Sequence, residues 1–170
     1  TGTPKGVTIH HQSVVNLISS LLINCKMTIN DQFLLWTTFV FDVSVAEIFI
    51  ILLTGCTGII ISNNNDLNFL QYIINYYSIT RCSFVPSILS ELQKYIPLSN
   101  LNNLISIWVA GEVYYHQKND LNNIYNLYGP TETTIYSTMI YCKKYDLYFS
   151  NIGKPISNTF CYVVYFGSLC

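Results

Sequence analysis

A cluster of polar side chains follows a tight corner in the second half of the chain, in the run NLYGPTETT at positions 126–134. Gly129 and Pro130 end the β-favouring run before them, because glycine tolerates unusual φ values and proline removes a donor from a strand ladder. Hydroxyls and a carboxylate come just after this corner, and open α/β sheets bind ligands at such carboxyl ends of strands. The residues alone leave two interpretations open: a ligand site, or a plain corner with an exposed glutamate.

A second group of polar atoms stands at the start of the chain, in the run TGTPKG at positions 1–6. Glycine, proline and threonine are too frequent here for regular structure, so backbone N–H groups, hydroxyls and the Lys5 ammonium are exposed together. Such donors can hold the anionic oxygens of a polyphosphate. The spacing of a Walker-type P-loop is absent, and a solvated loop is the alternative.

Asp42 is a carboxylate between two apolar residues, Phe41 and Val43. It can cap the apolar helix that the pattern predicts up to Leu53, a contribution of roughly 1 kcal/mol. If it instead lies in a dry pocket, it needs a cationic partner, because an unpaired buried charge is strongly unfavourable. The residues themselves do not choose between these two roles.

Three stretches, in the same order, resemble motifs of the adenylate-forming (AMP-binding) enzyme superfamily. Its members include acyl-CoA synthetases, luciferases and the adenylation domains of nonribosomal peptide synthetases. The run at 126–134 resembles the nucleotide-binding core motif, TGTPKGV at 1–7 resembles the second half of the Gly-rich phosphate loop, and FDVS at 41–44 resembles an element typical of amino-acid-activating members. One short motif is weak evidence, whereas three in order are strong evidence.

The resemblance implies an activity and its cofactors. Members join a carboxylate to the α-phosphate of ATP with Mg²⁺, release pyrophosphate, and pass the acyl group to a thiol. The implied catalytic residues are Lys5, Thr131 and Glu132, with Glu132 as the Mg²⁺ ligand. The implied phosphate-binding residues are Thr1, Gly2, Lys5 and Thr131. The implied adenine-binding residues are Gly111, Glu112, Asn126, Tyr128 and Gly129.

The resemblance also implies an amino-acid pocket, in which Asp42 pairs with the substrate's α-ammonium group. Its implied lining is Asp42, Val43, Ala46, Ser83, Trp108, Ala110, Leu127, Ile135 and Tyr136. Apart from Asp42, only Ser83 and the Tyr136 hydroxyl give this set polar tips. A charged substrate side chain would be buried unpaired, at several kcal/mol, so we expect a neutral side chain that is apolar or modestly polar.

The implied partners are an amino acid and a peptidyl carrier domain bearing phosphopantetheine, as in nonribosomal peptide synthesis. One alternative is an acyl- or aryl-CoA ligase, for which Asp42 is an awkward residue in an acyl pocket. A second alternative, of another class, is a nucleotide-binding remnant without catalysis.

Composition excludes several other classes. The net charge of -1 and the 10% of charged residues provide no basic patch for nucleic acid. The six cysteines are scattered without a Cys-x-x-Cys pair, which is typical of buried free thiols in a reducing, cytoplasmic compartment. The longest apolar run, 46–61, is interrupted by Glu47, Gly55 and Gly58, whereas a membrane span needs roughly 20 continuous apolar residues.

Strands and helices are expected to alternate along the chain, which predicts an α/β fold of parallel-sheet layers flanked by helices. Helices are predicted at 11–23, 43–53, 67–77 and 87–95. Strands are predicted at 32–37, 58–62, 80–85, 104–110, 123–127, 135–141 and 159–166. The resemblance identifies residues 1–170 as one fragment of an adenylation domain, within its large N-terminal part. We expect it to be truncated at both ends, to lack the small C-terminal domain, and not to turn over alone.

Overall fold

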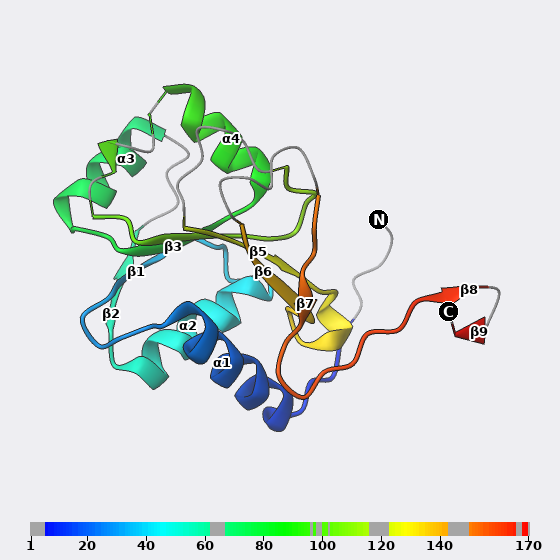
Figure 1. The fold of residues 1–170 in the computed structure, drawn as a ribbon. Helices are drawn as coiled ribbons and strands as arrows, with labels where there is room; N and C mark the ends of the chain where they lie inside the picture. Colours follow the sequence, from blue (N-terminus) through cyan, green and yellow to red (C-terminus); the bar gives the residue numbers. More distant parts are fainter. Residues whose placement is uncertain are drawn as a thin grey trace.

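The computed structural model describes residues 6–61, 67–95, 97, 100, 101, 103–115, 123–142, 150–165, 168 and 169. Its centre is a seven-stranded sheet in the order β2-β1-β3-β4-β5-β6-β7 (Figure 1). The strands from β2 to β5 in this order are parallel to one another. Strand β6 is antiparallel to β5, and β7 is antiparallel to β6. The predicted α/β class with a parallel sheet flanked by helices is therefore confirmed.

The elements have the following bounds. The helices are α1 (His11–Cys25), α2 (Val43–Thr54), α3 (Leu67–Tyr76), α4 (Pro86–Tyr95) and the 3-10 helix η2 (Thr131–Thr133). The strands of the large sheet are β1 (Gln32–Leu35), β2 (Thr57–Ile60), β3 (Arg81–Phe84), β4 (Ser106–Val109), β5 (Ile124–Tyr128), β6 (Thr138–Cys142) and β7 (Lys154–Pro155). A separate two-stranded sheet pairs β8 (Val164–Tyr165) with β9 (Ser168–Leu169).

Helices cover both faces of the sheet, with α1 and α2 on one side and α3 and α4 on the other (Figure 1). Every residue of β3 and β4 is buried, as expected for central parallel strands that are covered on both faces. Two apolar clusters result. One contains Leu70, Ile74 and Leu89 from α3 and α4, and the other contains Leu17 and Ile50 from α1 and α2.

The chain reverses its direction of travel across the sheet at β1. From β1 it passes through α2 to β2 on one side, and it returns through α3 to β3 on the other side of β1. The carboxyl ends of β1 and β3 therefore form a topological switch point, the place where open α/β sheets bind ligands.

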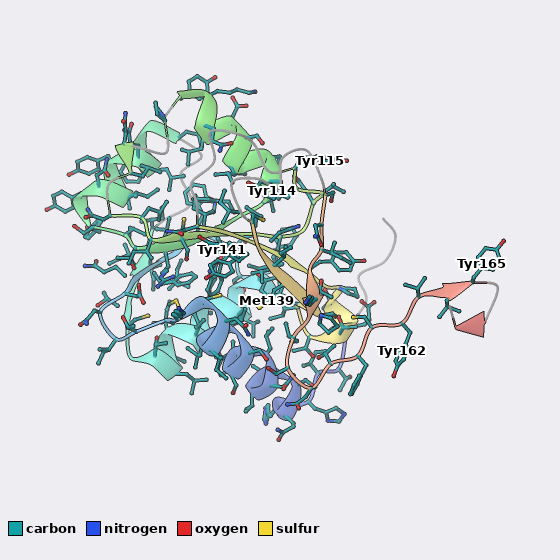
Figure 2. All side chains as sticks on the ribbon, in the orientation of Figure 1. Tyr114, Tyr115, Met139, Tyr141, Tyr162 and Tyr165 are labelled. Carbon is teal, nitrogen blue, oxygen red and sulfur yellow. The ribbon has the colours of Figure 1, made fainter. Side chains whose placement is uncertain are left out.

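Two predicted strands differ from the structure. The strand expected at 135–141 begins only at Thr138, because Thr134 and Ile135 have φ angles of 67° and 69°, which a strand cannot use. Within the predicted strand 159–166, only Val164 and Tyr165 pair in a sheet. This segment runs outward from the main sheet, where Figure 2 shows Tyr162 and Tyr165 projecting from it.

The cysteine prediction holds for most of the described thiols. Cys25, Cys56 and Cys82 are buried free thiols and Cys142 is buried, whereas Cys161 is exposed. Cys170 lies outside the described residues. In the part of the chain that the structure describes, no helix is both long and apolar enough to cross a membrane.

Candidate functional site

The corner after β5 brings an aromatic ring to the surface at the carboxyl edge of the sheet. Tyr128, the last residue of β5, is 52% exposed, so a flat ligand can reach its ring. Gly129 follows it where the backbone of residues 135–137 passes close by. A Cβ at Gly129 would lie 2.6 Å from the Ser137 nitrogen and 2.7 Å from the Ile135 oxygen. Only glycine fits this close approach of two backbone segments.

The loop from Pro130 to Ser137 is held in a strained conformation. Thr134 and Ile135 are β-branched residues in the left-handed region, which is rare and unfavourable for such side chains. Local hydrogen bonds fix the loop: the Tyr136 N–H donates to the Thr134 oxygen at 2.8 Å, and the Ser137 N–H donates to the Tyr128 oxygen at 2.8 Å. Such strain is concentrated at functional sites in proteins, and the sequence pattern did not reveal it.

Thr131 and Glu132 lie on η2, the single 3-10 turn inside this loop, and both are exposed. Among the described residues, the Glu132 carboxylate has neither a hydrogen-bond nor an ion-pair partner. A free carboxylate beside a hydroxyl is a suitable oxygen donor set for a hard cation such as Mg²⁺. The residues present therefore fit the predicted Mg²⁺-nucleotide role, which stays a prediction.

Gly111 and Glu112 form the corner after β4, next to β5. Gly111 has a φ of 87°, a conformation that favours glycine. The Glu112 carboxylate accepts hydrogen bonds from the Ser87 N–H and the Ser87 hydroxyl, each at 2.9 Å. A carboxylate here stabilises the amino terminus of α4. Glu112 thus has a structural role in addition to its predicted place beside adenine.

Asn126 is buried on β5, and its side-chain amide is already engaged. Its Nδ2 donates to the Asn151 carbonyl oxygen at 2.8 Å, which holds the segment after residue 150 against the sheet. The predicted contact of Asn126 with the edge of the adenine stays a prediction.

Asp42 precedes α2 at the carboxyl edge of β1, but its side chain makes no cap hydrogen bond. The capping alternative is therefore wrong. The Ser44 hydroxyl donates instead to the Phe41 carbonyl at 2.7 Å. Asp42 is half-buried, and its carboxylate has no partner among the residues that the structure describes.

Tyr136 shows where the Asp42 carboxylate lies. Burial raises the pKa of the Tyr136 hydroxyl well above its ordinary value, and the nearby carboxylates of Glu47 and Asp42 raise it further. Asp42 and Tyr136 are far apart in sequence, so the fold brings the loop before α2 and the loop before β6 to one place.

The predicted pocket residues converge in the same way. The apolar cluster on the α1 and α2 face contains most of them: Val43, Ala46, Trp108, Ala110, Leu127, Ile135 and Tyr136. Ser83 is paired in register with Trp108 on the neighbouring strand, so both side chains point to the same face of the sheet. The structure thus brings the predicted lining together, and what it binds stays a prediction.

Sequence reasoning missed Glu47, a fully buried carboxylate on the inner face of α2. Its Oε1 accepts a hydrogen bond from the Thr37 hydroxyl at 2.6 Å. Burial raises the pKa of Glu47 to about 7, although Thr37 and Ser83 oppose this shift. The signal in the sequence is a charged residue within an apolar helical run.

Three predicted phosphate-binding residues, Thr1, Gly2 and Lys5, lie outside the described residues. Across the described ranges, no group of three or more His, Cys, Asp or Glu side chains could hold a metal ion by itself. A Mg²⁺ ion held through Glu132 would therefore need the oxygens of its nucleotide as further ligands.

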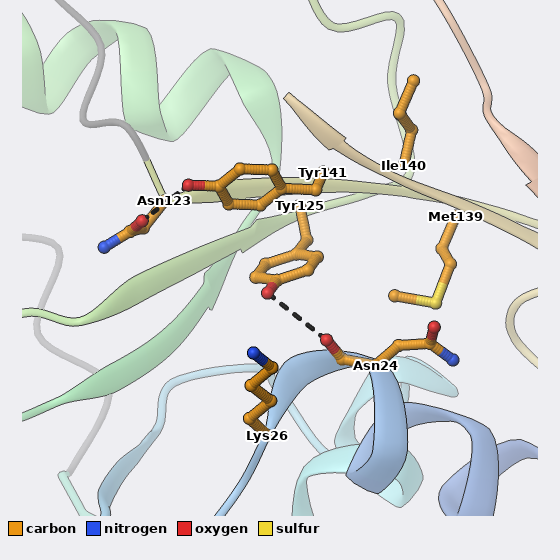
Figure 3. Close-up of a pocket in the computed structure, with 7 residues that line it drawn as sticks. All are labelled: Asn24, Lys26, Asn123, Tyr125, Met139, Ile140 and Tyr141. Atoms are coloured by element: carbon orange, nitrogen blue, oxygen red, sulfur yellow. Dashed lines mark hydrogen bonds between the residues drawn. The ribbon is translucent and has the colours of Figure 1, made fainter. Parts of the chain in front are cut away.

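A hollow of about 450 Å³ lies near the amino end of β5, away from the Tyr128 corner. Its lining is Asn24, Lys26, Asn123, Tyr125, Met139, Ile140 and Tyr141 (Figure 3). The Tyr125 hydroxyl donates to the Asn24 carbonyl at 3.4 Å, and the Tyr141 hydroxyl contacts Asn123 Oδ1 at 2.8 Å. None of the predicted site residues lines this hollow.

The fold and the placement of these residues define an α/β protein with a candidate ligand site at the carboxyl edge of a parallel sheet. The family model described as AMP-binding enzyme matches residues 1–166. The chain belongs to this family.

Relatives in sequence are nonribosomal peptide synthetases and related synthases. The chain is 34% identical to tyrocidine synthase 3 of Brevibacillus parabrevis, over 96% of this chain and 3% of that protein. It is 33% identical to zwittermicin A synthase ZmaJ of Bacillus cereus, over 96% of this chain and 35% of that protein. The chain thus spans only a small part of these relatives.

Solved structures share the fold. O-succinylbenzoate coenzyme A synthetase from Bacillus subtilis, in complex with ATP and magnesium ion, has a TM-score of 0.85 at 19% identity, covering 100% of this chain and 36% of that chain. A four-domain nonribosomal peptide synthetase bound to AMP and glycine has a TM-score of 0.78 at 26% identity, covering 92% of this chain and 12% of that chain.

Proposed function

We propose that this chain is part of an enzyme that activates an amino acid as an aminoacyl-adenylate, using ATP and Mg²⁺ and releasing pyrophosphate. The aminoacyl group then passes to the phosphopantetheine thiol of a carrier domain in nonribosomal peptide synthesis. Membership of the AMP-binding family supports adenylate formation, and relatives among peptide synthetases support the amino-acid substrate. A reducing, cytoplasmic setting agrees with the buried free thiols Cys25, Cys56 and Cys82 among the described residues.

The observation that carries the proposal is the state of Asp42. Its carboxylate is half-buried near Tyr136, without a partner among the described residues. A carboxylate in such a place favours a cationic ligand, because pairing offsets the loss of hydration. The α-ammonium group of an amino acid provides that cation, and a fatty or aryl acid does not.

The reaction needs little from the protein beyond positioning and charge neutralisation, as in other displacements at phosphorus. Bound Mg²⁺ would neutralise charge on the phosphates of ATP. Glu132 would hold that ion, Thr131 would donate to a phosphate oxygen, and Tyr128 would stack on the adenine. Asp42 would fix the amino group, so that one carboxylate oxygen of the substrate points at the α-phosphate.

An acyl- or aryl-CoA ligase is the second candidate, and the likeness in fold to O-succinylbenzoate coenzyme A synthetase favours it. A hydroxyl or ring in place of the α-ammonium group would leave Asp42 unpaired in the complex. For this reason we place it second.

The test is amino-acid-dependent pyrophosphate exchange in the intact protein, comparing Asp42→Ala with Asp42→Asn. Removing one partner of a desolvated charge pair costs about 2 kcal/mol or more, which predicts a loss of at least roughly 30-fold in kcat/KM for both variants. Glu91→Gln, on the exposed face of α4, is the matched control and should leave exchange unchanged. Unchanged exchange in Asp42→Ala would remove this residue from the pocket. Exchange with fatty or aryl acids, but not with amino acids, would favour the second candidate.

A further inference from the structure

The hollow near the amino end of β5 opens where α1 stops covering the sheet (Figure 3). The helix ends at Cys25, and Lys26 turns the chain away with a left-handed backbone, at a φ of 49°. The volume of about 450 Å³ falls within the range of small-molecule sites, roughly 300 to 1,000 Å³. A small ligand therefore has room here, and the lining residues specify its chemistry.

One wall of the hollow is aromatic and apolar. Tyr125 on β5 and Tyr141 on β6 are paired in register, and Met139 lies two residues from Tyr141, so the three side chains share one face of the sheet. The two rings have centroids 5.2 Å apart and an interplanar angle of 58°. Tilted rings at this spacing accept a third ring edge-on or offset, and a thioether packs well against an aromatic edge. This wall fits a flat, apolar body.

The wall formed by the end of α1 carries a positive charge. Figure 3 shows the Lys26 side chain extending from this end toward the Tyr125 hydroxyl. The seven lining residues, all of them described, include this one cation and no carboxylate. Neither ion pair among the described residues includes Lys26, and the neighbouring Arg81 guanidinium is already neutralised by Asp31. Lys26 is therefore the charge that a ligand meets, and it favours an anion.

Two further donors stand beside Lys26. The Tyr125 hydroxyl lies 3.4 Å from the Asn24 carbonyl oxygen, whereas O–H···O hydrogen bonds are usually about 2.5 to 3.0 Å long. Such a long bond is readily exchanged for a shorter one to a ligand. The Asn24 amide donates one N–H to the Ser20 carbonyl at 2.7 Å and has a second N–H. An anionic group with two oxygens can therefore accept hydrogen bonds from an ammonium, a hydroxyl and an amide.

We propose that this hollow binds a small aryl anion, a molecule with a flat ring that carries a carboxylate or a phosphate. Lys26, Tyr125 and Asn24 hold the anionic group, and the ring packs against Tyr141 and Met139. An amine would meet Lys26 as a like charge, and a neutral ring would leave the ammonium without a partner. The inference does not depend on the proposed function, because none of the candidate adenylation residues lines the hollow.

The experiment is isothermal titration of the intact protein with four ligands of similar size: benzoate, phenyl phosphate, benzyl alcohol and benzylamine. We expect at least one anion to bind roughly 10-fold or more tightly than benzyl alcohol, because charge-assisted hydrogen bonds are about twice as strong as neutral ones. Benzylamine should bind most weakly. Which anion binds more tightly then distinguishes a carboxylate ligand from a phosphate ligand.

The matched variants are Lys26→Met and Lys94→Met. Lys26→Met keeps a long apolar side chain but removes the ammonium, so it should weaken anion binding about 10-fold and leave benzyl alcohol unaffected. Lys94 lies on α4, which covers the other face of the sheet, and its replacement should change nothing. Lys26 is exposed, so the substitution leaves the core intact.

Methyl NMR of the intact protein locates the bound anion. Met139 is one of two methionines in this chain, and Met139→Leu assigns its methyl signal. An aryl ring in the hollow should shift that signal along the same titration curve as the calorimetry. A signal that stays still while the anion binds, or equal anion binding by Lys26→Met and the unmodified protein, would place the anion elsewhere and overturn the inference.

Tighter binding of benzylamine or benzyl alcohol than of both anions would overturn it as well. The absence of binding by either anion at millimolar concentration would show that the hollow holds only water. The proposed function is measured separately, by pyrophosphate exchange. Loss of exchange in Asp42→Ala with anion binding retained supports both proposals, and each can fail without the other.

Discussion

The same sheet buries polar groups in two regions, and they differ in how well those groups are paired. At the amino ends of the strands, Arg81 lies against Asp31, with Nε 2.9 Å from Oδ1. The remaining Arg81 donors contact Ser106 Oγ at 2.9 Å and the carbonyl oxygens of Cys25 and Lys26 at 3.2 and 3.4 Å. Toward the carboxyl ends, Glu47 Oε1 accepts a hydrogen bond from the Thr37 hydroxyl, and Glu47 Oε2 has no hydrogen-bond partner among the described residues.

The difference lies in how completely each region satisfies its own buried polar groups. A buried ion pair is tolerated only when further hydrogen bonds satisfy its remaining donors and acceptors. Arg81 and Asp31 meet this condition within the chain itself, so they need no ligand and act as a structural link between α1, β1, β3 and β4. The Glu47 region meets it less fully, because Glu47 Oε2 has no hydrogen-bond partner among the described residues.

Electrostatics separate the two regions in the same way. Burial raises the pKa of Asp31, but hydrogen bonds from Arg81, Thr28 and Thr80 outweigh it, and the pKa lies below its ordinary value. Burial raises the pKa of Glu47 to about 7, with weaker opposition from Thr37 and Ser83. The Asp31 carboxyl is therefore an anion at neutral pH, whereas the Glu47 carboxyl is close to the midpoint of its titration.

The largest expected effect comes from breaking the paired region with Arg81→Ala. Removing one partner leaves Asp31 as a buried, uncompensated charge, and such changes cost roughly 3 to 5 kcal/mol of unfolding free energy. Urea unfolding of the purified protein measures this loss. Since Arg81 also holds the Cys25 carbonyl, maleimide labelling of the Cys25 thiol should speed up, with the exposed Cys161 as the internal reference.

The control for this change is Lys94→Ala, which breaks the exposed ion pair between Lys94 and Glu91 on α4. Pairs of this kind contribute little, because water and salt screen them. We expect an unchanged urea midpoint. A loss in Arg81→Ala no larger than that in Lys94→Ala would contradict the structural role of the buried pair.

Sequence predicted the fold more fully than the site. The alternation of strands and helices is repeated along the chain, so errors at single boundaries did not change the α/β class. The candidate pocket residues were chosen by matching short motifs, and most of them share one apolar cluster in the fold. Glu47 and Arg81 could not be assigned in this way, because their roles depend on partners such as Thr37, Ser83 and Asp31 that only the packed structure identifies.

The backbone strain at Thr134 and Ile135 was equally invisible, since neither residue is a usual choice for a positive φ. A pattern of residue types predicts glycine or asparagine at such positions.

The wrong capping role for Asp42 has a related cause. Residue type and place before a helix favour capping, but the φ and ψ of −62° and −25° belong to the helical region rather than to the extended backbone of a usual cap.

The second-largest expected effect is a dependence of folding stability on pH, which arises from Glu47. The folded chain binds the Glu47 proton more tightly than the unfolded chain, whose pKa is near 4.5. The contribution of Glu47 to stability is therefore full below about pH 4.5 and is lost as the pH rises through about 7. The pKa difference corresponds to roughly 3 kcal/mol. Glu47→Gln removes this titration.

The measurement is the difference in urea unfolding free energy between Glu47→Gln and the unmodified protein at pH 5 and pH 8. Relative to the unmodified protein, the variant should become more stable at pH 8 than at pH 5. Asp31 does not contribute to this window, because its depressed pKa makes its stabilisation disappear only as the pH falls below about 3.8. A pH-independent difference would show that Glu47 is not the titrating group.

The smallest effect compares backbone strain in the two regions. Thr134 in the site loop and Lys26 beside the Arg81 network both have positive φ, at 67° and 49°. Left-handed backbone costs an ordinary residue about 1 to 2 kcal/mol, and asparagine adopts it more readily. Thr134→Asn and Lys26→Asn should each stabilise the protein by roughly 0.5 to 1 kcal/mol in urea unfolding. Lys26 is exposed at the end of α1, so its substitution relieves backbone strain alone. Thr134 is buried among the site residues, so its substitution also changes side-chain packing. If Lys26→Asn stabilises the protein and Thr134→Asn does not, then packing around the site loop, rather than its backbone, sets the conformation that presents Glu132.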